Sequence, residues 1–127
     1  MVPVLAVLLQ GCSAGKIQNE KIGDIDFTVV KEEDYPDEVK ALIEKQKYEP
    51  FQSVFLDGAY MYVLVGYGEQ NTTGYSIRIE GVYETPTSIV VDTNLLGPQP
   101  DAELTGENTF PLIVLKMKPS DKEVACV

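Results

Sequence analysis

The sequence predicts a mainly β domain of the α+β class, with one N-terminal helix packed on an antiparallel sheet of about six strands. Three observations lead to this prediction. Apolar residues recur at helical spacing only in segment 36–47, whereas after residue 50 they mostly alternate with polar residues, and turn-forming residues separate these later segments. The resulting order is β-α-β-β-β-β-β, and the short connections favour antiparallel neighbours.

The helix is predicted between Pro36 and Lys47. Proline is tolerated in the first helical turn, and acidic residues around it suit the positive end of the helix dipole. Val39, Leu42 and Ile43 follow the spacing i, i+3, i+4 and therefore form one apolar stripe that can dock on a sheet.

A hairpin is the best-defined feature of the predicted sheet. Segments 51–56 and 59–67 flank Asp57-Gly58, a pair typical of tight turns with positive backbone angles at both positions. Segment 59–67 is apolar on both faces, which predicts a central strand covered on both sides. The other expected strands are 26–30, 75–80, 88–93 and 110–117, with a Gly-, Pro- and acid-rich loop at 97–108.

The first twelve residues form a short apolar run that ends in Leu9-Gln10-Gly11-Cys12. Such a run is too short to span a bilayer and is typical of a signal peptide. Its ending resembles the lipobox of bacterial lipoproteins, and this resemblance implies cleavage before Cys12 and lipidation of its thiol. Stable anchoring needs two or more acyl chains. The expected location is therefore extracytoplasmic, with a lipid anchor in the cell membrane.

The expected domain organisation is a signal peptide at 1–11, a lipidated tether at 12–24 and a single domain at 25–127. No Lys or Arg precedes Lys16, although signal peptides normally begin with positive charge, so the true start could lie upstream of Met1. The alternative is that segment 4–9 is a buried strand and Cys12 an ordinary thiol.

The amino-acid composition argues against several classes of function. A net charge of −10 argues against nucleic acid and anionic lipid headgroups as partners, because both would be repelled, and leaves a cationic protein partner possible. The chain has no histidine, so the usual general base and the commonest transition-metal ligand are absent. We expect no catalytic residues, no metal and no cofactor. If Cys12 is lipidated, Cys126 has no partner for an intramolecular disulfide.

One segment between two predicted strands has the composition of a binding loop. Its glycines allow unusual backbone angles, its Asn and Thr side chains can bond amides of another chain, and its tyrosines offer large contacts with polar tips. The alternative is a demanding turn that only closes the sheet. The predicted partner-binding residues are Gly66, Tyr67, Gly68, Gln70, Asn71, Thr72, Thr73, Gly74 and Tyr75.

Four stretches of the chain together carry a resemblance to a known family. They are Val63-Leu64-Val65-Gly66-Tyr67-Gly68-Glu69-Gln70, Thr73-Gly74-Tyr75-Ser76-Ile77, Val90-Val91-Asp92-Thr93 with Pro98, and Phe110-Pro111-Leu112-Ile113-Val114-Leu115-Lys116. They resemble the PrcB C-terminal-domain family, whose members include short lipoproteins and which is named for an accessory subunit of a surface protease complex. The resemblance covers roughly 51–118 and implies a non-enzymatic, protein-binding module that stabilises or assembles an extracytoplasmic protease complex.

The segment Asn71-Thr72-Thr73-Gly74-Tyr75 is also similar to a loop of chagasin-like inhibitors, which insert loops into the clefts of cysteine proteases. This second resemblance implies an alternative function, protease inhibition through the loop from Gln70 to Tyr75. The segment in this chain lacks the proline that the corresponding loop has in the inhibitors. Both classes, an accessory subunit and an inhibitor, remain open at this point.

Overall fold

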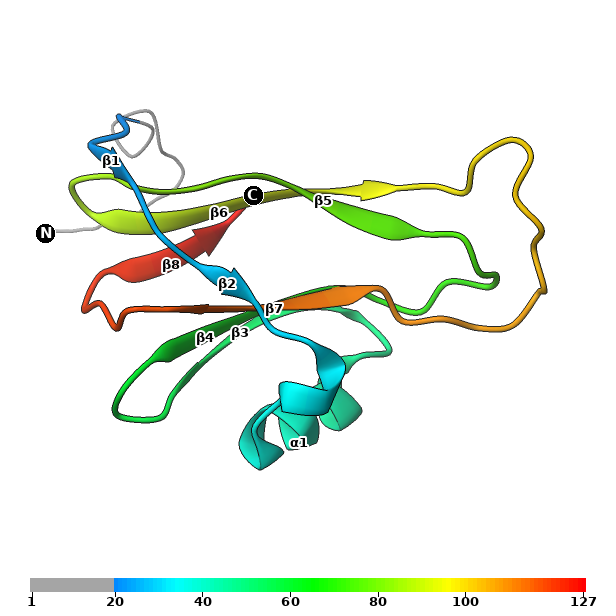
Figure 1. Cartoon of the computed structure of the whole chain (residues 1–127), viewed down its shortest axis with the longest axis horizontal. Coiled ribbons are helices and arrows are strands. Elements are labelled where there is room, and N and C mark those ends of the chain that lie inside the picture. The colour runs from blue at the N-terminus through cyan, green and yellow to red at the C-terminus, as the bar shows by residue number, and fades with distance from the viewer. Residues whose placement is uncertain (1–19) are drawn as a thin grey trace, which may run out of the picture.

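The computed structural model describes residues 20–127 as two facing four-stranded β-sheets, with one helix on the outside (Figure 1). The mainly β prediction with one N-terminal helix is therefore confirmed. The elements in chain order are β1 Gly23–Asp24, β2 Thr28–Val29, the 3-10 helix η2 Glu32–Asp34, α1 Asp37–Gln46, β3 Pro50–Leu56, β4 Met61–Tyr67, β5 Ser76–Glu84, β6 Ser88–Leu96, β7 Leu112–Met117 and β8 Glu123–Cys126.

The prediction of a single antiparallel sheet of about six strands is wrong in number and arrangement. Eight strands form two sheets, of order β1-β5-β6-β8 and β2-β7-β4-β3, and β8 runs parallel to β6. Alternation along a strand shows which residues share a face but does not show which sheet the strand joins. Residues 23–24 pair with β5, so the last part of the predicted tether belongs to the first sheet.

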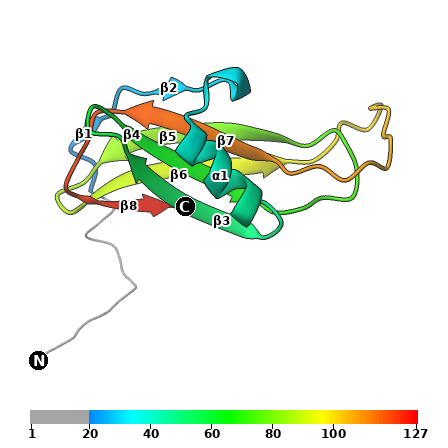
Figure 2. The same ribbon diagram turned by 90° about the horizontal axis from the view of Figure 1, so that it is seen from below.

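The helix has the predicted position, beginning after Pro36 and ending at Gln46, with Lys47 as its C-cap residue. It covers the outer face of the second sheet (Figure 2). Val39 and Ile43, which the apolar stripe contained, are buried there against a cluster that includes Leu64. Burying such side chains stabilises the fold by about 1.5–3 kcal/mol each.

β4 is the central, covered strand that its sequence predicts. It pairs with β3 on one side and with β7 on the other, and its first six residues are buried. Met61, Val63 and Val65 face the other sheet, whereas Tyr62 and Leu64 face the helix side. The two apolar faces of β4 therefore contribute to two separate core clusters.

The predicted hairpin forms, with a turn slightly longer than expected. Leu56 pairs with Met61, so the second strand begins at residue 61 rather than 59. Asp57 Oδ1 accepts hydrogen bonds from the amides of Tyr60 (2.7 Å) and Ala59 (2.8 Å). These bonds stabilise the carboxylate and hold the pKa of Asp57 below its ordinary value.

The turns and loops gather at two opposite ends of the sandwich (Figure 1). Loops 68–75 and 97–111 lie at the right-hand end. The left-hand end holds the β3–β4, β5–β6 and β7–β8 turns and the start of the described chain, where the Ile22 amide donates to the Glu84 carbonyl at 2.7 Å. Cys12 and the predicted signal peptide lie outside the described residues. Within residues 20–127, no helix is long and apolar enough to cross a membrane.

Candidate functional site

The predicted partner-binding loop lies against a second loop, and we call residues 68–75 and 97–111 together the paired loops. Gln70 and Thr109 exchange two backbone hydrogen bonds, of 2.8 and 2.9 Å, in an isolated antiparallel bridge. The Thr109 hydroxyl also donates to the Thr72 carbonyl at 2.8 Å. Segments far apart in the sequence therefore form one structural unit at the end of the sandwich.

Side chains of the predicted loop take part in this pairing. The hydroxyls of Thr73 and Thr72 accept bonds from the Thr105 amide at 3.3 Å and the Gly106 amide at 3.4 Å. Glu69 Oε2 accepts a bond from the side-chain amide of Asn108 at 2.6 Å. The two hydroxyls that the sequence offered for contact with a partner thus also position the second loop.

The backbone geometry at Gly74 explains why a glycine is needed where the two loops meet. Its φ is +102°, a conformation in which L side chains are strained. A Cβ atom at this position would lie 2.9 Å from Pro98 Cβ and 3.3 Å from Leu104 Cδ2. The close approach of the loops therefore depends on a missing side chain.

The first residues of the predicted binding set lie inside the sandwich. Gly66 is buried at the end of β4, where the Phe51 ring occupies the space that a Cβ atom would need. Tyr67 is half-buried, and its hydroxyl lies 2.6 Å from Thr93 Oγ1 on β6. These two residues support the paired loops from below rather than forming their outer surface.

The outer surface of the paired loops is polar and acidic. Asn71 and Gly74 are exposed, and so are all residues at 101–108, which include three carboxylates. Leu104 is an apolar exception, with 53% of its surface exposed. The surface thus combines amide, carboxylate and aliphatic groups.

Sequence reasoning missed an aromatic group at the same end. The Tyr48 and Phe110 rings meet edge to face, with centroids 5.2 Å apart, and Lys47 Nζ lies 4.6 Å from the Phe110 centroid. Tyr48 is 53% exposed, and its carbonyl accepts a bond from the Glu69 amide at 3.2 Å. The only sequence signal for this aromatic contact was the position of Tyr48 just after the predicted helix. That position suggests a connecting segment rather than part of a binding surface.

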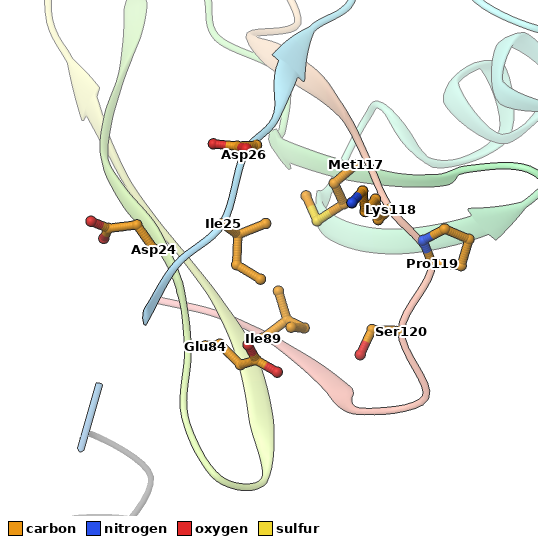
Figure 3. A pocket seen from close by; sticks show the side chains of 9 residues that line it. All are labelled: Asp24, Ile25, Asp26, Glu84, Ile89, Met117, Lys118, Pro119 and Ser120. Carbon is orange, nitrogen blue, oxygen red and sulfur yellow. The ribbon is translucent and has the colours of Figure 1, made fainter. Parts of the chain in front are cut away.

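A hollow of about 290 Å³ lies at the opposite end (Figure 3). Ile25, Ile89 and Met117 supply its apolar part, while the Asp24 carboxylate points away from it. Glu84, on its rim, is paired with Lys122 at 2.6 Å. The hollow therefore has apolar side chains inside it, and one of its rim carboxylates, Glu84, is neutralised by a lysine.

Chemistry-bearing groups in the described part of the chain are dispersed. No group of three or more Cys, Asp or Glu side chains among residues 20–127 is arranged to hold a metal ion. Burial raises the pKa of the Cys126 thiol to about 11. Because the thiolate is the nucleophilic form, this environment makes Cys126 less reactive than an ordinary cysteine.

The fold and the paired loops define a β-sandwich domain that presents a fixed loop surface at one end. Residues 61–118 match the family described as PrcB C-terminal, so this part of the chain is similar to that family. The match runs from the start of β4 to just beyond β7 and includes both paired loops. It relates the chain to a subunit of a protease complex. No curated protein and no solved structure matches the chain.

Proposed function

We propose that this chain is a non-enzymatic accessory subunit that binds an exported protease through its paired loops. The observation that carries the proposal is the bridge between Gln70 and Thr109, which fixes two loops into one surface. The family is named for a protease-complex subunit, and the matched segment contains this bridge.

Preorganisation supports binding by the paired loops. A loop that is ordered only on binding loses conformational entropy at that moment, which weakens affinity. Here the backbone bridge, the Thr109 hydroxyl and the Thr72 and Thr73 hydroxyls already hold the loops together. The exposed Leu104 supplies an apolar contact at their surface, and three carboxylates beside it favour a cationic patch on the partner.

The position of the chain start supports membrane anchoring through lipid on Cys12. The described chain begins at the end of the sandwich opposite the paired loops (Figure 1). An anchor on the N-terminal side would therefore leave the paired loops facing away from the membrane. It would also confine them near other envelope proteins, which raises the effective concentration of a partner in the same membrane.

Site-specific photo-crosslinking in the native membrane tests this function. A photoreactive side chain at position 71 or 104 should crosslink to an exported protease. The matched control is position 87, an exposed threonine in the β5–β6 turn at the opposite end. Equal crosslinking from all three positions, or crosslinks that contain no protease, would contradict the proposal. Recovery of the chain in the soluble fraction with an unmodified Cys12 would contradict the lipid anchor.

The alternative is inhibition of a cysteine protease through residues 70–75. It is supported by the exposure of Asn71 and Gly74 on a loop that a β-sandwich holds in place. Titration against a papain-type enzyme separates the two functions. Inhibition at micromolar concentration, weakened by Asn71→Ala, would favour the inhibitor function. An unchanged proteolytic rate would contradict that function.

A further inference from the structure

β3 is an unprotected edge strand. Natural edge strands are commonly short, charged, bulged or covered, because an open edge can pair with another chain. Of the other edge strands, β1 and β2 have two residues each, and β8 has four and contains Glu123. β3 has seven residues, contains no charged residue, and pairs with β4 without a register shift.

Alternate residues of β3 direct their backbone groups away from β4. Asp57 N donates to Tyr60 O, so this pair is of the hydrogen-bonded kind. Hydrogen-bonded and non-hydrogen-bonded pairs alternate along an antiparallel ladder. Counting back along the register, Gln52, Val54 and Leu56 fall in non-hydrogen-bonded pairs. Their amides and carbonyls therefore point to the free edge.

The same three residues point their side chains to the face that the two sheets share. Val54 pairs with Val63, and Leu56 pairs with Met61, both buried between the sheets. Yet Val54 is 44% and Leu56 is 57% exposed. The sandwich is thus open along β3. A groove of about 330 Å³ begins at Gln52 of this strand and is lined from the first sheet by residues of β5, β6 and β8.

We propose that the free edge of β3 accepts an extended segment of a partner protein as a fifth strand of the second sheet. Strand addition of this kind obtains affinity from main-chain hydrogen bonds and specificity from alternate side chains. One row of side chains in the added segment is apolar and covers Val54 and Leu56. This surface is separate from the paired loops and does not depend on their function.

Charge identifies the chemistry of the added segment. Glu49 precedes β3, Asp57 follows it, and Glu123 lines the groove from β8, so carboxylates lie at both ends of the uncharged strand and on the facing edge. A segment with Lys or Arg between its apolar residues complements this arrangement. A second copy of the chain is a poorer occupant, because each copy carries a net charge of −10.

Amide hydrogen exchange on the full chain tests the proposal. The probe is a nine-residue synthetic peptide in which valine alternates with lysine and threonine. The free chain should exchange quickly at Gln52, Val54 and Leu56 and slowly at Phe51 and Phe55. The peptide should slow exchange at the first three amides by about tenfold or more, the scale of a hydrogen bond newly made.

Two control peptides test the pattern and the charge. A peptide of the same composition with its valines grouped together should give no protection, and one with glutamate in place of lysine should bind at least about tenfold more weakly. Protection confined to β8 or to the paired loops would overturn the proposal, as would no protection at millimolar peptide. Concentration-dependent protection of β3 without peptide would instead show that a second copy is the occupant.

Substitutions on the two edges of the second sheet complete the test. Val54→Lys places a charge on the proposed edge and should abolish protection, whereas Thr28→Lys places the same charge on β2 and should leave protection unchanged. Val54→Thr keeps the β-branched shape and should retain binding. Continued slow exchange at Phe51 and Phe55 shows that each variant is folded, so equal binding by Val54→Lys and Thr28→Lys would refute the edge as the site.

Discussion

The hydroxyl of Tyr67 on β4 lies 2.6 Å from Oγ1 of Thr93 on β6, so one hydrogen bond links the two sheets near the paired loops. Thr93 is only 8% exposed. A hydroxyl buried to this extent depends on protein partners, since water has little access to it. The bond therefore ties the position of the loop that follows β4 to the facing sheet.

Tyr67→Phe should lower the free energy of unfolding by about 1–2 kcal/mol, because it leaves the Thr93 hydroxyl buried without this partner. Urea denaturation measures the change. In the double variant with Thr93→Val, both hydroxyls are absent, so the loss should be smaller than the sum of the two single losses. Strictly additive losses would show that the two hydroxyls do not interact.

Gly66→Ala should destabilise the chain by about 1–3 kcal/mol, because the new methyl group would overlap the Phe51 ring in a packed region. Gly97→Ala is the matched control, since a Cβ atom there meets nothing within 4 Å, and it should change stability by less than about 0.5 kcal/mol. Thermal denaturation compares the two. Combined with Gly66→Ala, the Phe51→Leu substitution should restore part of the lost stability, because it removes the ring that the new methyl group overlaps. No recovery in this double variant would contradict the steric explanation.

Much of the fold could be predicted because local periodicity reports burial. Val39 and Ile43 lie on one helical stripe, and Leu64 lies in a strand apolar on both faces, so their environments follow from sequence spacing. The division into two sheets could not be predicted, because it depends on pairing between distant strands. β1 and β8 were missed because two and four residues are too short to show a period.

Only part of the candidate site could be predicted from the sequence. The glycine at position 74 indicated an unusual turn, and the structure gives it a positive φ. The pairing of Gln70 with Thr109 left no local signal, because neither residue is of a type that requires the other. The binding role of the loop stays a prediction, whereas its contact with 97–111 is a structural result.

Cys126 should react slowly with iodoacetamide. With a pKa of about 11 in place of its ordinary 9.0, its thiolate fraction at pH 8 falls about a hundredfold. Peptide mass spectrometry, which separates Cys126 from Cys12, should show slow labelling in buffer and rapid labelling in concentrated urea. The raised pKa also means that the buried, protonated thiol of Cys126 contributes fully to the free energy of unfolding below pH 9. This contribution is lost as the pH rises toward 11. Equal labelling of folded and unfolded chain would contradict the burial of this thiol.

The Asp57 turn should make the stability of the β3–β4 hairpin depend on acid pH. The amides of Tyr60 and Ala59 stabilise the carboxylate, so its pKa lies below the ordinary 3.8. A lowered pKa gives a contribution that is present above pH 3.8 and lost as pH falls through the folded value. Asp57→Ala should therefore be less stable than the natural chain at neutral pH, and the difference should shrink below pH 3.8.

Urea denaturation between pH 7 and pH 3 measures that difference. Asp57→Asn is the matched control, because its side-chain oxygen can still accept both amide bonds but cannot be protonated in this range. Its stability relative to the natural chain should therefore improve as the pH falls, whereas that of Asp57→Ala should converge on the natural value. A difference between Asp57→Ala and the natural chain that grows on acidification would mean that the carboxylate destabilises the turn, contrary to the hydrogen bonds it accepts.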